Sequence, residues 1–301
     1  MNVLLLFPVA DGQTGPAIKH AFENLGHKVI AVDAKLEPQN SFLMSQQLDF
    51  DIVFCSRTKE LAPEVEKIRK RLPDAKICMW NVDTRNTIEE WSHLFPLIRA
   101  CDHHFVVAYN LIPKWKAINP NTHWLPQGLQ DEVYDRPEKI TDADRARYSC
   151  DVSFAGSCTG YHKWRKPYLN AIDEMGLDFK LWGCREIARV YNEEHNKMAA
   201  LSKINFAYSG WINNGRYVSV RNFKIMGAGG FLLKYRGMDV DMICPPDTLD
   251  YYSTIPELKE KILYWLAHEK ERKERAERAY KWVHENATYT HRIQQALEYM
   301  R

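Results

Sequence analysis

The chain alternates short β-rich runs with helical stretches, and this alternation limits the folds open to it. The first series of predicted strands covers Val3–Phe7, Lys28–Val32, Asp51–Cys55, Lys76–Trp80, His104–Val107 and His123–Leu125. The clearest helices between them are Pro16–Leu25, Pro63–Arg71 and Thr87–Ile98. Such alternation is typical of a parallel sheet covered by helices. The sequence therefore predicts a doubly wound, Rossmann-like domain over residues 1–128.

The same alternation restarts after a stretch without apolar periodicity. Residues 129–148 lack that periodicity and are predicted to form an interdomain linker. The second series begins with a strand and small-residue loop at Asp151–Ser157, followed by predicted strands at Phe179–Trp182, Ile204–Tyr208 and Phe231–Lys234. Helical patterns lie between and after these strands. We therefore expect a second α/β domain over 149–301, whose last helix could return to the first domain.

Composition and charge exclude several classes of partner. The 301 residues include 41 basic and 39 acidic side chains, a formal net charge of only +2. A near-neutral chain gives no overall attraction to nucleic acid or to an anionic membrane surface. The first residues, Met1–Pro8, lack a basic signal-peptide region, and no apolar run approaches the roughly 20 residues of a membrane span. We expect a cytoplasmic protein without a transmembrane segment.

The residue types that bind metals are scattered. Seven cysteines form no C-x-x-C pair, which argues against both a disulfide framework and a zinc site and favours buried free thiols. His103 and His104 have no third ligand nearby, so a structural role is expected for them. Asp239-Val240-Asp241 has the D-x-D form of metal-dependent sugar-nucleotide enzymes, but dipeptide-spaced acids are common in loops. No metal ion is expected.

Candidate site residues lie at predicted strand exits, because ligands of doubly wound sheets bind at the carboxyl ends of the strands, here around a cleft expected between the domains. The loop Asp11–Pro16 contains Gly12, Thr14 and Gly15 and opens a helix, but it lacks the G-x-G-x-x-G fingerprint. Asp83 follows another strand and is a candidate base or sugar-hydroxyl acceptor, with helix capping as the alternative. The same two roles are open to Asp11.

The segment Ser219–Leu233 predicts a short helix that ends on glycines and leads into a buried strand. Ser219 is a suitable N-cap, and Arg221 would add a full charge to the positive helix end, which together suit a phosphate. Gly227, Gly229 and Gly230 would allow close approach of the backbone. The alternative is an ordinary buried helix ended by a glycine C-cap.

Over residues 120–300 the sequence resembles GT-B glycosyltransferases, specifically the family-4-like branch that includes spore-maturation-type glycosyltransferases. The resemblance rests on Val152–Ser157 with Arg165 downstream, on Leu201–Phe206, on Arg221–Leu233 and on Trp124–Gly128. In the first domain it is weaker and rests on Trp80–Asp83. It implies two Rossmann-like domains facing a cleft, the first on the acceptor side and the second holding the donor.

The resemblance also implies transfer of a sugar from a nucleotide sugar to an unidentified acceptor, without metal or cofactor. The implied donor-binding residues are Gly156, Ser157, Arg165, Ser219, Arg221, Asn222, Lys224, Gly227 and Gly229, with Asp83 and Asp11 as catalytic candidates and Gly12, Thr14 and Gly15 on the acceptor side. Lys224 replaces the family's ribose-binding glutamate, and a lysine has only donors. Two alternatives therefore stay open: a catalytically silent sugar- or nucleotide-binding protein and a sugar-nucleotide epimerase.

Overall fold

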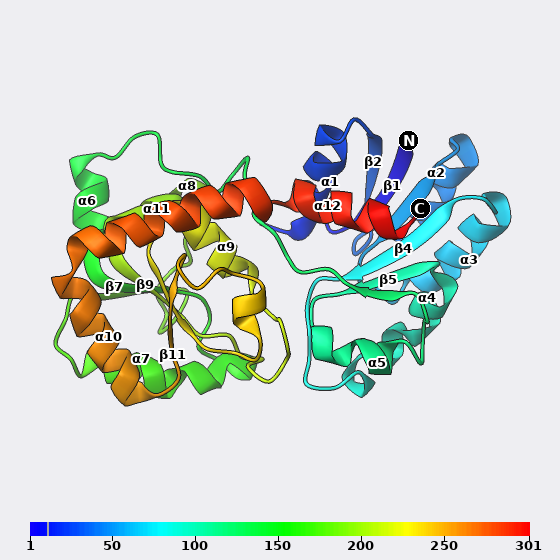
Figure 1. Ribbon diagram of the computed structural model, residues 1–301. Coiled ribbons are helices and arrows are strands. Elements are labelled where there is room, and N and C mark those ends of the chain that lie inside the picture. Colours follow the sequence, from blue (N-terminus) through cyan, green and yellow to red (C-terminus); the bar gives the residue numbers. More distant parts are fainter. Residues whose placement is uncertain (11) are drawn as a thin grey trace. The chain divides into compact units, whose positions relative to one another are not determined.

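The computed structural model describes residues 1–10 and 12–301, which divide into two compact units. Unit 1 comprises Met1–Gln127, Asn213–Tyr217 and Tyr289–Arg301, and unit 2 comprises Gly128–Ile212 and Val218–Thr288. Each unit contains a parallel sheet with helices on both faces (Figure 1). The predicted fold class, two doubly wound α/β domains, is confirmed.

In the described part of unit 1, six parallel strands have the order β2-β1-β3-β4-β5-β6. Their bounds are β1 Asn2–Phe7, β2 Lys28–Asp33, β3 Ile52–Cys55, β4 Lys76–Asn81, β5 His103–Val106 and β6 Thr122–Trp124. The helices are α1 Thr14–Asn24, α2 Asn40–Gln47, α3 Leu61–Arg71, α4 Phe95–Ala100, α5 Ile112–Trp115 and α12 Tyr289–Tyr299, with 3-10 turns at Glu89–Leu94 and Tyr109–Leu111.

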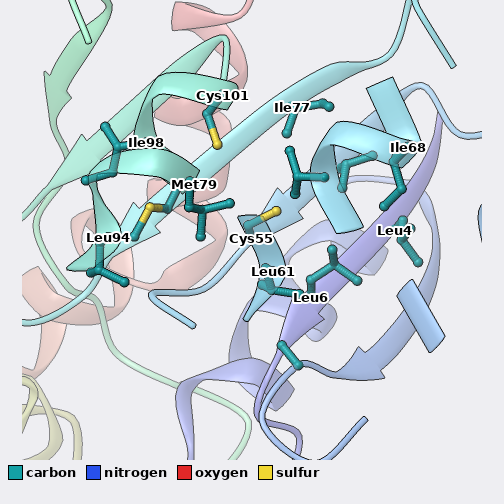
Figure 2. Packing of buried hydrophobic residues seen from close by; sticks show 14 of the residues in the cluster. Leu4, Leu6, Cys55, Leu61, Ile68, Ile77, Met79, Leu94, Ile98 and Cys101 are labelled. Atoms are coloured by element: carbon teal, nitrogen blue, oxygen red, sulfur yellow. The ribbon is translucent and has the colours of Figure 1, made fainter. Parts of the chain in front are cut away.

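The buried side chains of β1 divide between two apolar layers, because successive residues of a strand point to opposite faces. Leu4 and Leu6 join the layer that packs against α3 and α4, and Figure 2 labels both among the buried side chains of this layer. Val3 and Leu5 join the opposite layer, beneath α1 and α12. Since α12 belongs to this second layer and lies beside α1, the C-terminal helix completes the core of unit 1.

The five strands described in unit 2 are also parallel, in the order β11-β10-β9-β7-β8. Their bounds are β7 Cys150–Ala155, β8 Phe179–Trp182, β9 Ser202–Ala207, β10 Leu232–Tyr235 and β11 Asp250–Tyr252. The helices are α6 Asp142–Tyr148, α7 Lys166–Asp173, α8 Asn192–Leu201, α9 Val220–Gly227, α10 Ile255–Ala267 and α11 Glu269–Asn286, with 3-10 turns at Gly160–Arg165 and Val240–Met242.

The connections of unit 2 determine where its sheet changes its direction of winding. Helices α7 and α10 cover one face of the sheet, whereas α8, α9 and α11 pack together over the other (Figure 1). Strand β7 pairs with β8 on one side and with β9 on the other, so the chain reverses its direction of winding at β7. In doubly wound sheets this switch point opens a crevice at the carboxyl ends of the strands.

Two elements of unit 2 differ from the sequence prediction. Strand β11 was not predicted, and it is only three residues long. Helix α6 lies within residues 129–148, the expected linker, and begins with a capping box in which the Thr141 side chain accepts from the Asp144 amide while the Asp144 carboxylate accepts from the Thr141 amide. No helix in the described ranges is long and apolar enough to cross a membrane.

Candidate functional site

A pocket of about 310 Å³ opens at the carboxyl ends of β7 and β8 in unit 2. Its lining contains four cationic side chains, those of Arg165, Arg189, Arg221 and Lys224. Within the described residues, no aspartate or glutamate lines it. A concave site with several positive charges and no carboxylate is suited to an anionic ligand.

The loop that follows β7 requires a glycine at its first position. Gly156 has a φ of +152°, and its amide donates to the Trp182 carbonyl at 2.8 Å. A Cβ atom built on Gly156 would lie 2.5 Å from Nη2 of Arg221. Glycine therefore serves both the backbone conformation and the close approach of the Arg221 guanidinium.

Arg165 holds the pocket loops in place. It is 3% exposed, its Nε donates to the Tyr208 carbonyl at 2.9 Å, and its Nη1 donates to the Ser157 carbonyl. These bonds join the exits of β7 and β9. The guanidinium carbons of Arg165 and Arg221 both lie over the ring of Phe154, at 5.5 and 5.3 Å from its centroid. Two like charges on one ring repel each other, and an anion between them would relieve that repulsion.

Helix α9 begins at the pocket edge. Ser219 occupies its N-cap position with extended backbone, as predicted, but its hydroxyl makes no capping hydrogen bond. Arg221 therefore lies in a first turn whose amide groups receive no side-chain cap. The uncapped amide groups and the Arg221 guanidinium both add positive electrostatic potential at the start of α9.

A second cationic group lies one turn further along α9. The Lys224 Nζ donates to the Tyr134 hydroxyl at 2.7 Å and lies 4.0 Å from the centroid of the Tyr134 ring. Burial, and then the charge of Arg221, lower the pKa of Lys224 to about 8. Burial, followed by the charges of Lys224 and Arg221, lowers the pKa of His195 to about 3, so this imidazole is neutral.

The structure brings together five of the predicted donor residues, namely Gly156, Ser157, Arg165, Arg221 and Lys224. Ser219, Asn222, Gly227 and Gly229 lie outside the lining of this pocket. Gly227 faces Leu129 and the Tyr134 carbonyl, and a Cβ there would come within 2.5 Å of Leu129. Gly229, with a φ of +76°, lies against Arg136 at the far end of α9.

The candidates of unit 1 lie at the exits of β1 and β4. Asp83 forms an ion pair with Arg57, and the guanidinium of Arg57 covers the ring of Trp91. Thr14 is the first residue of α1, and a Cβ on Gly15 would lie 2.2 Å from the Pro8 carbonyl oxygen, so α1 packs closely on the β1 exit. Gly12 has a φ of +76°. Asp11 lies outside the described residues.

The cysteine prediction was wrong in one respect. Cys158 and Cys184 form a disulfide, whereas the five other cysteines are buried free thiols, as predicted. The bond joins the loop after β7 to the loop after β8, and both loops border the pocket. The sequence does not reveal this pair, because the residues are 26 positions apart and meet only through the pairing of β7 with β8.

Several pocket residues carry no motif that would identify them from sequence. Tyr134 comes from the expected linker, Trp182 ends β8, Arg189 and Tyr191 belong to the following loop, and His195 lies on α8. The signal available for Trp182 was its position at the end of a predicted strand. The others lie near the pocket only because of the tertiary fold.

A larger cavity of about 500 Å³ lies at the opposite ends of β7, β9 and β10. Its charged side chains are partly paired with one another, Lys203 with Asp151 at 2.8 Å and Lys273 with Glu269 at 2.5 Å. It therefore has less charge available for a ligand than the smaller pocket. No group of three or more potential metal-ligating side chains was found in the part of the chain that the structure describes.

Comparison with solved structures shows which known proteins share this fold. A glycosyltransferase from Rickettsia africae ESF-5 is 12% identical with a TM-score of 0.67, and the match covers 99% of this chain and 97% of that one. Anabaena HepE, solved with UDP and glucose, is 12% identical with a TM-score of 0.63, covering 100% and 99%. A trehalose-6-phosphate synthase is 9% identical with a TM-score of 0.70, covering 99% and 98%. The architecture is that of GT-B glycosyltransferases.

The family follows from the sequence of the second half. Residues 140–298 match the model of the family described as glycosyl transferase-like. The chain therefore belongs to the glycosyl transferase-like family, and the predicted enzyme class, a glycosyltransferase, is confirmed. A search of curated protein sequences found no significant match.

Loss of the Cys158–Cys184 disulfide should destabilise unit 2, because the bond restricts the unfolded chain. We expect the double variant Cys158→Ser/Cys184→Ser to lose about 2–4 kcal/mol in its free energy of unfolding. Urea unfolding of wild type and variant, each with and without a thiol reductant, measures this loss. The reductant should change only the wild type; an unchanged wild type would contradict the prediction.

Proposed function

We propose that this protein transfers a sugar from a nucleotide-sugar donor and that the donor diphosphate binds the pocket of unit 2. The observation that carries the proposal is the acid-free lining, with Arg221 and Lys224 on one helix and Gly156 beneath the Arg221 guanidinium. The structures of Anabaena HepE with UDP and with UDP-glucose support this class of donor.

The pocket suits the chemistry of such a transfer. When the bond to the sugar breaks, negative charge develops on the leaving diphosphate. Arg221 and the start of α9 would stabilise that charge more strongly in the transition state than in the bound donor. The amide of Ser157 is a further candidate donor to the phosphates, and Arg165 contributes by fixing the loops.

We place the acceptor on unit 1. Asp83 and Asp11 are our candidates for the groups that activate it, and Gly12, Thr14 and Gly15 are our candidates for contacts with the acceptor. Asp83 forms an ion pair with Arg57, so a candidate base and a cation lie together at the exit of β4. We also propose membership of the family-4-like branch with spore-maturation-type enzymes, a cytoplasmic location and no cofactor.

A second candidate function is nucleotide binding without catalysis. Lys224 favours it, because an ammonium group cannot accept hydrogen bonds from a ribose diol. Incubation with a panel of nucleotide sugars and detection of released nucleoside diphosphate separates the two functions. Release above the rate without protein supports transfer or donor hydrolysis, whereas binding without release supports the silent protein.

Replacing Arg221 should weaken nucleoside-diphosphate binding. We expect Arg221→Ala to lose about 1.5–3 kcal/mol, the range for a hydrogen bond to a charged partner. Titration calorimetry with UDP and GDP measures the loss. The matched control is Arg185→Ala, whose guanidinium pairs with Asp173 at 2.5 Å outside the pocket lining. Wild-type affinity in a folded Arg221→Ala protein would contradict the assignment.

The affinity for a nucleoside diphosphate should fall as the pH rises above about 8, where Lys224 of the ligand-free protein loses its proton. The terminal phosphate, with a second pKa of about 6, stays ionised in that range. Lys224→Ala should abolish this pH dependence and should weaken UDP more than uridine. Equal losses for both ligands, or an unchanged pH profile, would remove Lys224 from the phosphate site.

We also propose that no divalent metal is needed, because the pocket supplies positive charge itself. UDP binding and sugar transfer should therefore survive treatment with a chelator. Restoration of lost activity by magnesium or manganese would overturn this proposal. It would then direct attention to Asp239 and Asp241, where Asp239 has a left-handed φ of 52°.

A further inference from the structure

His195 is a buried histidine whose hydrogen-bonding capacity is unused. It lies on α8, is 5% exposed and lines the pocket of unit 2. Neither ring nitrogen has a hydrogen-bond partner among the described residues. Its ring packs edge-on against Tyr134, with 5.4 Å between centroids. Buried polar groups are nearly always paired, so two unpaired nitrogens at a pocket wall indicate that a ligand supplies the partner.

The chemistry of that partner follows from the other groups in the pocket. Arg189, Arg221 and Lys224 are hydrogen-bond donors, and so is the indole of Trp182, whose Nε1 also has no partner in the described structure. A neutral imidazole has one donor and one acceptor nitrogen. His195 therefore offers a buried acceptor nitrogen in a pocket whose described lining has no carboxylate.

We propose that His195 accepts a hydrogen bond from a ribose hydroxyl of the bound nucleotide and thereby selects ribonucleotides over deoxynucleotides. The inference rests on the proposed function, since it assumes that a nucleoside diphosphate occupies this pocket. The cationic side chains can donate hydrogen bonds to the phosphate oxygen atoms, whereas a sugar hydroxyl that donates its proton needs an acceptor.

The position of His195 agrees with a hydroxyl next to the phosphates. Lys224 lies three residues after Arg221, on nearly the same side of α9 and further from the helix start. The Lys224 ammonium and the His195 ring both contact Tyr134. His195 is thus beside the inner end of the cationic site, where the sugar attached to a diphosphate would lie.

Binding of UDP, 2′-deoxy-UDP and 3′-deoxy-UDP to wild type, His195→Phe and His195→Gln tests the proposal. Wild type should prefer UDP about tenfold over at least one deoxy analogue, the upper range for one neutral hydrogen bond. His195→Phe keeps an aromatic ring but no acceptor, so it should bind UDP and that analogue equally. His195→Gln restores an acceptor and should recover part of the preference.

The matched control is His104→Phe, because His104 is also a buried histidine whose pKa is lowered to about 3 by burial, but it lies in unit 1. It should keep the wild-type preference. Should His195→Phe fail to fold, His195→Gln is compared with wild type instead. A preference unchanged in every folded His195 variant overturns the inference while UDP binding survives. Wild type that binds neither UDP nor GDP overturns the proposed function and the inference together.

Discussion

The approach of the Arg221 guanidinium to the bare backbone of Gly156 is the contact on which the pocket depends. It is possible only because position 156 has no Cβ and because α9 begins beside the end of β7. Arg165 donates to the carbonyls of Ser157 and Tyr208 and so holds the loops after β7 and β9 in position beside this contact. The cationic site is therefore a property of packed loops and not of one helix end.

The ligand-free pocket is electrostatically costly. Lys224 is buried beside Arg221, and its lowered pKa expresses how unfavourable the charged form is there. His195 and the indole of Trp182 leave polar atoms unpaired in the same wall. An anion bearing a hydroxyl group would neutralise the buried charge and would pair these polar atoms. The groups that lower the stability of the ligand-free protein are therefore the groups that would select such a ligand.

The sequence predicted the sheets well because their strands are short apolar runs with marked boundaries. It also singled out Gly156, Arg165 and Arg221, which line one pocket in the structure, because they lie at predicted strand exits and helix starts. It could not identify Tyr134, His195 or the Cys158–Cys184 bond, since each depends on which segments become neighbours after folding. Gly227 and Gly229 were predicted to approach a ligand because glycines follow the predicted helix. In the structure they lie instead against the side chains of Leu129 and Arg136.

Because the chain returns to unit 1 after unit 2, the two units cannot be separated by cutting the chain at one position. Unit 1 takes Asn213–Tyr217 from between β9 and α9, and α12 from the C-terminus, so the backbone passes between the units four times. No single cut separates them. A fragment ending at residue 128 would leave the layer of Val3 and Leu5 without Tyr289 and Ile293. Unit 1 therefore takes part of its interior from residues that follow all of unit 2 in the sequence, and its core can form only after unit 2 has been synthesised.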